Sequence, residues 1–170
     1  MKMMIVSDIH GSAYWCRKMI DRYKEEGADR LLILGDILYH GPRNDLPEEY
    51  NPKAVIEMLN PLSNEILCVR GNCDSEVDQM VLNFSIMADY SFLNMDGISV
   101  FVTHGHIYNR ENLPSLKKGD YLLNGHFHIP EIVEYDDYTY LNPGSISIPK
   151  GGSDNSYMIF EDGEFVIKTL

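Results

Sequence analysis

Two short motifs in this chain place side chains of metal-binding type two residues apart. They are Asp8-Ile9-His10 and His126-Phe127-His128. In an extended segment, residues two apart point to the same side, so each pair can face a single centre. These pairs are stronger signals than a lone aspartate at a strand end, which often serves as a turn residue or a helix cap. The hypothesis of a metal site therefore depends on whether other such residues join them.

Similar polar residues follow several apolar segments that have the character of buried strands. Asp8 and His10 follow residues 3–6, Asp36 follows 31–34, Asn72 follows 66–69, His104 follows 100–103, and His126 and His128 follow 121–123. Ligand sites in α/β sheets form beyond the carboxyl ends of the strands. Glycines beside most of these residues let the backbone turn sharply there. Five strand ends that all supply such residues predict one metal centre made of these seven side chains.

The mixture of carboxylate, imidazole and amide ligands indicates which metals this centre would hold. It suits divalent ions such as Mn, Fe, Co, Ni or Zn rather than Ca or a thiolate-bound metal. A carboxylate such as Asp36 can bridge two cations about 3.5–4 Å apart, and water between them then loses a proton near neutral pH. This chemistry is metal-assisted hydrolysis and needs no covalent nucleophile, with Asp36 as a predicted catalytic residue.

The elements that must position these residues differ between the two halves of the chain. The front half alternates strands over 3–6, 31–34 and 66–69 with helices over 13–26 and 52–59. Ser12 is the expected N-cap of the first helix and Gly27 its terminator. Alternation of strand and helix favours a βαβ framework. The Gly-, Pro- and Asn-rich loop over 37–51 is long for a connector, which is typical of a functional loop.

The back half is rich in hairpin signals. Asp96-Gly97, Asp136-Asp137 and Asp162-Gly163 each separate two strand-like segments, and Asp-Gly in that position is a strong hairpin signal. Two packed sheets with helices outside accommodate both halves. We therefore expect an α/β sandwich formed by a single domain over residues 1–170.

Composition and charge limit the classes of partner. The 170 residues include 26 Asp and Glu against 14 Lys and Arg, a formal charge of -12. A field of that sign repels polyanions, so no stable nucleic-acid complex is expected. Three cysteines (Cys16, Cys68 and Cys73) give no disulfide framework. The first apolar run ends at Asp8, too early for a signal peptide or a membrane span. These features predict a cytoplasmic protein with no membrane partner.

In order and spacing, the motifs resemble those of the calcineurin-like metallophosphoesterases. The matching motifs are Asp8-x-His10, Gly35-Asp36, Gly71-Asn72-x-Asp74, His104-Gly105, Gly125-His126-x-His128 and Asn142-Pro143-Gly144-Ser145. The resemblance covers the whole chain. It implies an αββα sandwich, two mixed β-sheets flanked by helices, and a centre of two metals, most commonly manganese. It also implies a dimer or a tetramer.

The resemblance assigns each ligand to one of two metals. Asp8, His10, Asp36 and His128 would hold the first, and Asp36, Asn72, His104 and His126 the second. Asn72 would also contact a phosphate oxygen of the substrate, which makes it the second predicted catalytic residue.

One position departs from the family pattern. Many members have a histidine after the Gly-Asn pair, where it resembles a general acid, and this chain has Cys73. A thiol has an ordinary pKa of about 8.5 and is a poor proton donor to an alkoxide. We therefore expect Cys73 to contact the substrate rather than replace that acid. The natural substrate would then have a leaving group that needs little protonation, or another group would supply the proton.

Two arginines are candidates for phosphate contact, because a guanidinium matches phosphate oxygens. Arg70 precedes Gly71, and a structural ion pair is its alternative role; Arg43 lies in the long loop, with a surface role as its alternative. His106 is expected to support the site rather than bind metal. His40 is expected to be a solvated loop residue, with a role toward the substrate as its alternative.

The resulting functional prediction is a metal-dependent phosphodiesterase that acts on a small phosphate ester. A phosphomonoesterase or nucleotidase would use the same centre. A protein-interaction scaffold without turnover is a third interpretation, although all seven ligand positions hold competent residues. A nuclease is disfavoured by the acidic surface and by Cys73.

Overall fold

The structure, a computed structural model, describes residues 1–170, and its front half alternates strands with helices. In chain order the elements are β1 (Met3–Val6), α1 (Ala13–Glu26), β2 (Arg30–Ile33), α2 (Pro52–Leu59), the 3-10 helix η1 (Asn60–Leu62), β3 (Ile66–Cys68) and α3 (Glu76–Gln79). Strands β1, β2 and β3 pair in parallel, as the predicted βαβ framework requires. The second and third strands end one residue earlier than predicted.

The back half consists of strands. They are β4 (Tyr90–Met95), β5 (Ile98–Thr103), β6 (Asp120–Leu123), β7 (Pro130–Glu134), β8 (Tyr138–Pro143), β9 (Ser156–Glu161) and β10 (Glu164–Thr169). The pairs β4–β5, β7–β8 and β9–β10 are antiparallel, which confirms the three predicted hairpins. Asp96 and Asp162 have positive φ at their turns, as an Asp-Gly hairpin requires.

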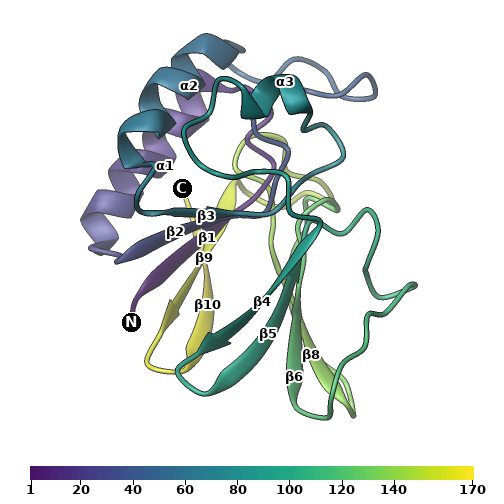
Figure 1. Cartoon of the computed structure of the whole chain (residues 1–170). Helices are drawn as coiled ribbons and strands as arrows, with labels where there is room; N and C mark the ends of the chain where they lie inside the picture. Colours follow the sequence, from purple (N-terminus) through teal and green to yellow (C-terminus); the bar gives the residue numbers. More distant parts are fainter.

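These strands form two mixed sheets packed face to face (Figure 1). The first has the order β10-β9-β1-β2-β3 and the second β4-β5-β6-β8-β7. The layer between them is apolar: side chains such as Ile5, Leu32, Val102 and Leu141 are buried there. The predicted sandwich of two mixed sheets is confirmed.

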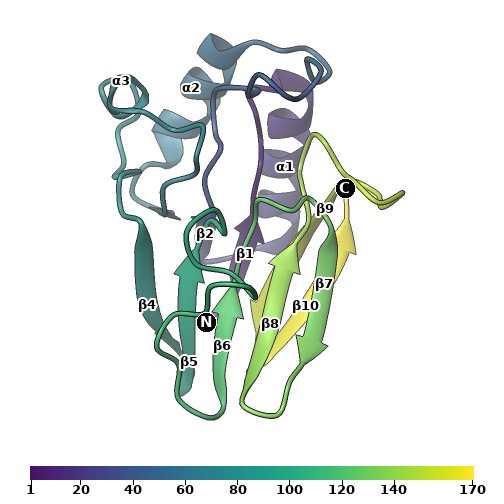
Figure 2. The same cartoon turned by 90° about the vertical axis from the view of Figure 1, so that its right-hand side faces the viewer.

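The helices cover the first sheet only. Residues of α1 and α2, including Met19 and Val55, pack against its outer face. No helix follows α3, so the outer face of the second sheet, which Figure 2 presents to the viewer, carries none. Tyr108 and Leu116 of the connection between β5 and β6 pack there instead. The expectation of helices outside both sheets is therefore half correct.

The connection between β5 and β6 contains a side-chain-stabilised turn at Asn109. The Asn109 side chain accepts hydrogen bonds from the backbone N–H groups of Glu111 and Asn112, at 2.8 and 3.1 Å. These contacts hold a local turn in the connection between β5 and β6.

The parallel strands direct their carboxyl ends to one end of the sandwich. Asp8, Asp36 and Asn72 follow β1, β2 and β3, while His104 and His126 follow β5 and β6. Loops from both sheets therefore meet at the same crevice. None of the helices is both long and apolar enough to cross a lipid bilayer.

Candidate metal centre

Three ligand atoms converge after β1 and β6. The Asp8 Oδ1 atom lies 3.1 Å from His128 Nε2 and 3.4 Å from His10 Nε2. The two imidazole nitrogens are 3.4 Å apart. All three residues are buried. Together they can offer one carboxylate oxygen and two nitrogens to a single cation.

A second group of ligand atoms lies around His104. Its Nε2 atom is 3.1 Å from Asn72 Oδ1, 3.2 Å from His126 Nδ1 and 3.4 Å from Asp36 Oδ2. Asp36 Oδ2 is also 3.8 Å from His10 Nε2, so this carboxylate lies between the two groups. The structure thus brings all seven predicted ligand residues together.

Backbone carbonyls fix the orientation of three of the imidazole rings. The Nδ1 atoms of His10, His104 and His128 lie 2.8, 2.7 and 2.6 Å from the carbonyl oxygens of Tyr39, Leu34 and Ile148. A carbonyl oxygen only accepts, so each Nδ1 carries the hydrogen. In the neutral ring Nε2 then has a free lone pair directed into the cluster, which is the usual arrangement of metal-binding histidines.

The buried Asp8 carboxylate provides the test of whether a cation fits. Its Oδ2 atom accepts hydrogen bonds from Ser7 Oγ at 2.6 Å and from the His126 N–H at 3.0 Å, but Oδ1 is buried without a hydrogen-bond donor. A buried charged oxygen is costly unless it is paired or coordinates a metal. The donor set and this orphaned oxygen fit a divalent metal.

The electrostatics of the cluster favour added positive charge. Burial raises the pKa values of Asp8 and Asp36, but the close contacts and positive charges of the neighbouring histidines outweigh burial and hold both pKa values below the ordinary range. Burial lowers the pKa of His104, yet the charges of Asp36 and Asp8 outweigh it and raise this pKa to about 9. Burial and the charge of His104 lower the pKa of His126 to about 4. In the metal-free protein a proton on His104 therefore takes the place of a cation.

We expect the metal-free protein to lose stability between pH 6.5 and pH 9. Because the folded-state pKa of His104 is raised from 6.5 to about 9, its contribution is complete below pH 6.5 and disappears as the pH rises through the folded-state pKa. The shift corresponds to about 3 kcal/mol. Urea unfolding of chelator-treated protein at the two pH values measures the difference. His104→Gln should remove most of this pH dependence of the free energy of unfolding. A wild-type free energy of unfolding that stays constant or rises between pH 6.5 and pH 9 would contradict the raised pKa of His104.

The backbone at these ligands is strained. Asp8, His10, Asp36, His126 and His128 have φ values between 49° and 64°. Residues other than glycine rarely adopt this left-handed region, and doing so costs about 1–3 kcal/mol each at such sites. The strand ends therefore make abrupt turns that direct five ligand side chains inward.

Hydrogen bonds across the strand ends hold these turns. The Asp8, His10 and Gly125 N–H groups donate to the carbonyls of Gly35, Asp36 and His104, at 3.2, 2.9 and 2.8 Å. The first two contacts join the loops after β1 and β2, and the third joins those after β5 and β6. Each ligand loop is thus fixed by its neighbour.

Asp74 positions the loops after β2 and β3, a role that sequence analysis did not identify. Its carboxylate is buried and accepts the N–H groups of Gly71, Asp36 and Ile37 at 2.7, 2.8 and 2.9 Å. It therefore fixes the backbone at Asp36 and at Gly71, which precedes Asn72. Its place in the Gly-Asn-x-Asp motif was the available signal.

Two serines after β8 support Asp8 in a similar way. Ser145 Oγ and Ser147 Oγ donate to the Asp8 carbonyl oxygen at 2.9 and 3.0 Å. They lie 137 and 139 residues from Asp8 in the chain. Sequence analysis placed Ser145 in a family motif without giving it this role.

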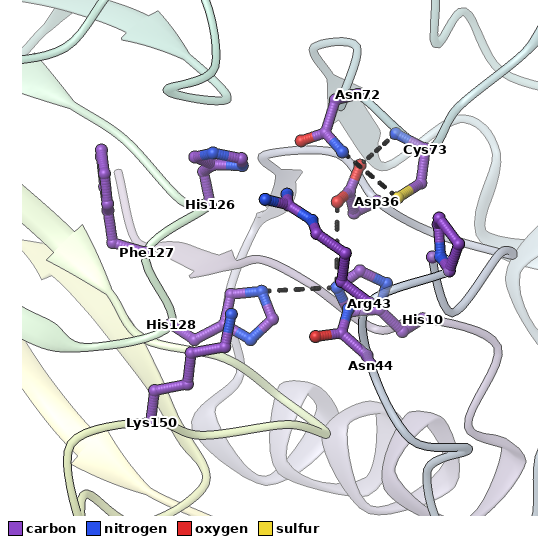
Figure 3. Close-up of a pocket in the computed structure, with 12 residues that line it drawn as sticks. His10, Asp36, Arg43, Asn44, Asn72, Cys73, His126, Phe127, His128 and Lys150 are labelled. Carbon is purple, nitrogen blue, oxygen red and sulfur yellow. Dashed lines mark hydrogen bonds and ion pairs between the residues drawn. The ribbon is translucent and has the colours of Figure 1, made fainter.

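A polar pocket of about 380 Å³ opens above the ligand cluster (Figure 3). Its lining includes the ligands His10, Asp36, Asn72, His126 and His128, together with Gly41, Pro42, Arg43, Asn44, Cys73, Phe127 and Lys150. The long loop over residues 37–51 thus forms one wall. Lys150 is a lining residue that sequence analysis did not single out.

The other candidate residues lie at different distances from this pocket. Arg43 and Cys73 line it, whereas Arg70 does not and forms an ion pair with Asp89 at 2.6 Å. The alternative role considered for Arg70 is therefore present, and its contact with substrate stays a prediction. The His106 ring lies 5.4 Å from that of His104, outside the pocket lining.

His40 differs from expectation. Its ring packs edge-on between those of Tyr39 and Tyr50, at 4.8 and 5.1 Å, and its Nδ1 atom is buried without a partner. The prediction of a solvated side chain is correct only in part, because the ring is half-buried between two tyrosines of the same loop.

The fold and the centre define a metallophosphoesterase. Residues 1–163 match the calcineurin-like phosphoesterase superfamily domain, and the chain belongs to this family of phosphoric ester hydrolases. The family predicted from the motifs is confirmed.

The most informative relative is the phosphodiesterase YfcE of Escherichia coli. It is 46% identical over 162 residues, which cover 95% of this chain and 88% of YfcE. The solved YfcE structure matches with a TM-score of 0.93 over 95% of this chain and 89% of that chain. A phosphodiesterase of Methanocaldococcus jannaschii is 26% identical over 152 residues, or 85% of this chain and 83% of its own.

The fold also occurs in a protein that is not named as a phosphoesterase. Vps29 of Entamoeba histolytica, solved with zinc, has a TM-score of 0.63 at 20% identity over 99% of this chain and 97% of that chain. A likeness at that identity concerns the fold alone.

Proposed function

We propose that this protein is a phosphodiesterase that hydrolyses a small phosphate diester at a centre of two divalent metals. The observation that supports this most strongly is the convergence of two groups of ligand atoms, with Asp36 between them, beneath a polar pocket. The similarity to YfcE, which is named a phosphodiesterase, points to the same reaction.

The residues of the chain have distinct proposed roles. Asp8, His10, Asp36 and His128 would hold one metal, and Asp36, Asn72, His104 and His126 the other. When bound, the metals supply Lewis acidity that neutralises phosphate charge and lowers the pKa of water to about 7. Asn72 faces this pocket and would orient the scissile phosphate, and Arg43 lines the same pocket as a proposed substrate contact. Asn72 Nδ2 also donates to Cys73 Sγ at 3.3 Å, so the thiol lies beside this contact.

Cys73 is unsuited to protonate a leaving group. Burial and the nearby charge of Asp36 raise the pKa of its thiol. Efficient general acids have pKa values near the working pH, and their loss costs about 10²–10⁴-fold in rate. We infer that the natural diester has a leaving group that departs without strong acid assistance.

Cys73→His should increase turnover of diesters with alkoxide leaving groups, by about 10²-fold. Turnover of p-nitrophenyl diesters should change little, because p-nitrophenolate needs no proton. Steady-state kinetics on an alkyl and an aryl diester measure the difference, with Cys68→Ser as the control, since Cys68 lies outside the pocket lining. Unchanged rates on every substrate would count against this role.

The proposed reaction is tested with two substrates that share one leaving group. The protein should hydrolyse a p-nitrophenyl diester with added Mn²⁺, faster than the corresponding monoester and not after chelation. Faster hydrolysis of the monoester would favour a phosphomonoesterase. Absence of turnover with Mn²⁺, Co²⁺, Zn²⁺ and Fe²⁺, despite bound metal, would favour a scaffold protein.

Several finer features belong to the same proposal. Manganese is the proposed metal, and residues 1–170 are proposed to act as one domain, because β9 pairs with β1 and so joins the back of the chain to the front. A cytoplasmic location agrees with three free cysteines. A dimer or tetramer would be detected by gel filtration with light scattering.

A further inference from the structure

Two cationic side chains enter the pocket above the metal ligands. Arg43 and Lys150 are the only lysine or arginine residues among the lining residues, and they reach toward the cluster from two separate loops (Figure 3). Neither forms an ion pair with a carboxylate, and both line the cavity with exposed side chains. In a chain of formal charge -12, two unpaired cations beside one cavity indicate an anionic ligand.

The backbone of Lys150 is hydrogen-bonded to that of His128, a candidate metal ligand. Its N–H donates to the His128 carbonyl oxygen at 3.0 Å, and the Nδ1 atom of the same histidine lies 2.6 Å from the Ile148 carbonyl oxygen. On the other side, Ser153 donates to the Lys150 carbonyl from Oγ at 2.7 Å and from N at 3.2 Å. The loop that bears this lysine therefore has a fixed position relative to the centre.

Arg43 projects from a turn with its own internal contacts. The Asn44 side chain donates to the His40 carbonyl at 2.7 Å, and the Asn44 N–H donates to the Gly41 carbonyl at 3.3 Å. Gly41 has a φ of 79°, which suits glycine. The guanidinium is thus presented from a closed turn rather than from an extended loop.

The charge of the proposed centre indicates what these cations would bind. Two divalent metals with the carboxylates of Asp8 and Asp36 carry about +2, and a monoanionic diester and an anionic nucleophile together offset about that amount. The charges of Arg43 and Lys150 are then not needed to neutralise the scissile phosphate. The cavity of about 380 Å³ lies within the range of small-molecule sites, about 300–1,000 Å³, and has room for more than one phosphate group.

We propose that Arg43 and Lys150 bind a second anionic group of the substrate, a phosphate or a carboxylate on one ester arm. This inference rests on the proposed diesterase function and narrows its substrate class to diesters that bear a further negative charge. The planar guanidinium of Arg43 would donate two parallel hydrogen bonds to the oxyanion, and the ammonium group of Lys150 would add a positive charge. Both are specificity-determining residues of the same site.

Binding can be measured without turnover. Phosphonoacetate and methylphosphonate share one phosphonate and differ in an added carboxylate. Isothermal titration of the manganese-loaded protein with each compound gives the preference for the second anion, with metal content measured after each titration. Arg43→Gln, Lys150→Gln and the double variant are compared with Lys118→Gln, which removes an exposed charge from the segment before β6.

The wild type and Lys118→Gln should bind phosphonoacetate at least about tenfold more tightly than methylphosphonate. Each pocket variant should reduce that ratio, and the double variant should bring it to about one. No preference in the wild type, or a preference that survives in the double variant, overturns the inference. Hydrolysis of a p-nitrophenyl diester is measured separately, so a failure of the diesterase proposal is distinguished from a failure of this one.

Discussion

Replacing Asp36 with asparagine should reduce metal-dependent diester hydrolysis by about 10³-fold or more. Asp36 is buried, its Oδ2 lies 3.4 Å from His104 Nε2 and 3.8 Å from His10 Nε2, and its Oδ1 accepts the Cys73 N–H at 2.8 Å. Asparagine preserves the shape and removes the charge that two metals would share. Loss of several kcal/mol of transition-state stabilisation corresponds to a rate decrease of this size.

Kinetics and metal analysis together check this expectation. Asp36→Asn should bind fewer metal ions per chain than the wild type, while circular dichroism shows an intact fold. Asp45→Asn removes an exposed carboxylate from the same long loop and should behave as the wild type. A variant at Asp36 with a full metal complement and more than a tenth of the activity would exclude a bridging role for this side chain.

Gly71→Ala should destabilise the protein by about 3 kcal/mol or more and disrupt the metal centre. A methyl group on Gly71 would collide with the backbone N and the carboxylate Oδ1 of Asp36. Backbone atoms cannot rotate away as the end of a flexible side chain can. The loop after β3 would have to separate from the loop after β2, and Asn72 would move with it.

Thermal unfolding and metal content measure both effects. For a chain of this size, 3 kcal/mol corresponds to a decrease in Tm of about 10 °C. Gly27→Ala is the comparison: Gly27 has a φ of 62° and no atoms within 4 Å of an added Cβ, so only the left-handed strain of about 1–2 kcal/mol applies. Equal destabilisation by the two substitutions would show that the contact with Asp36 is readily relieved.

The convergence of the seven candidate ligand residues could be predicted because it follows a local rule. Each ligand comes directly after a short apolar segment, and the carboxyl ends of parallel strands gather at one end of a sheet. The Asp-Gly pairs at 96 and 162 located two hairpins, and Ser12 and Gly27 located the limits of α1. These signals depend on residues near one another in the chain.

Features that depend on distant contacts could not be predicted in this way. Lys150 reaches the pocket because its backbone bonds to His128, and Ser145 supports Asp8 from 137 residues away. No spacing rule connects such residues. Helices outside the second sheet were expected although the back half of the sequence carries hairpin signals rather than an alternation of strand and helix.

The position of β9 beside β1 has a consequence for the synthesis of the protein. Ligands are drawn from residues 8 to 128, but β1 lies between β2 and a strand made of residues 156–161. On the ribosome, where chains emerge at about 5–20 residues per second, β9 is made about 8–30 s after β1, so β1 lacks one of its two neighbours during that time. The first sheet should therefore be complete only after residues 156–161 have been made, long after the last candidate ligand, His128.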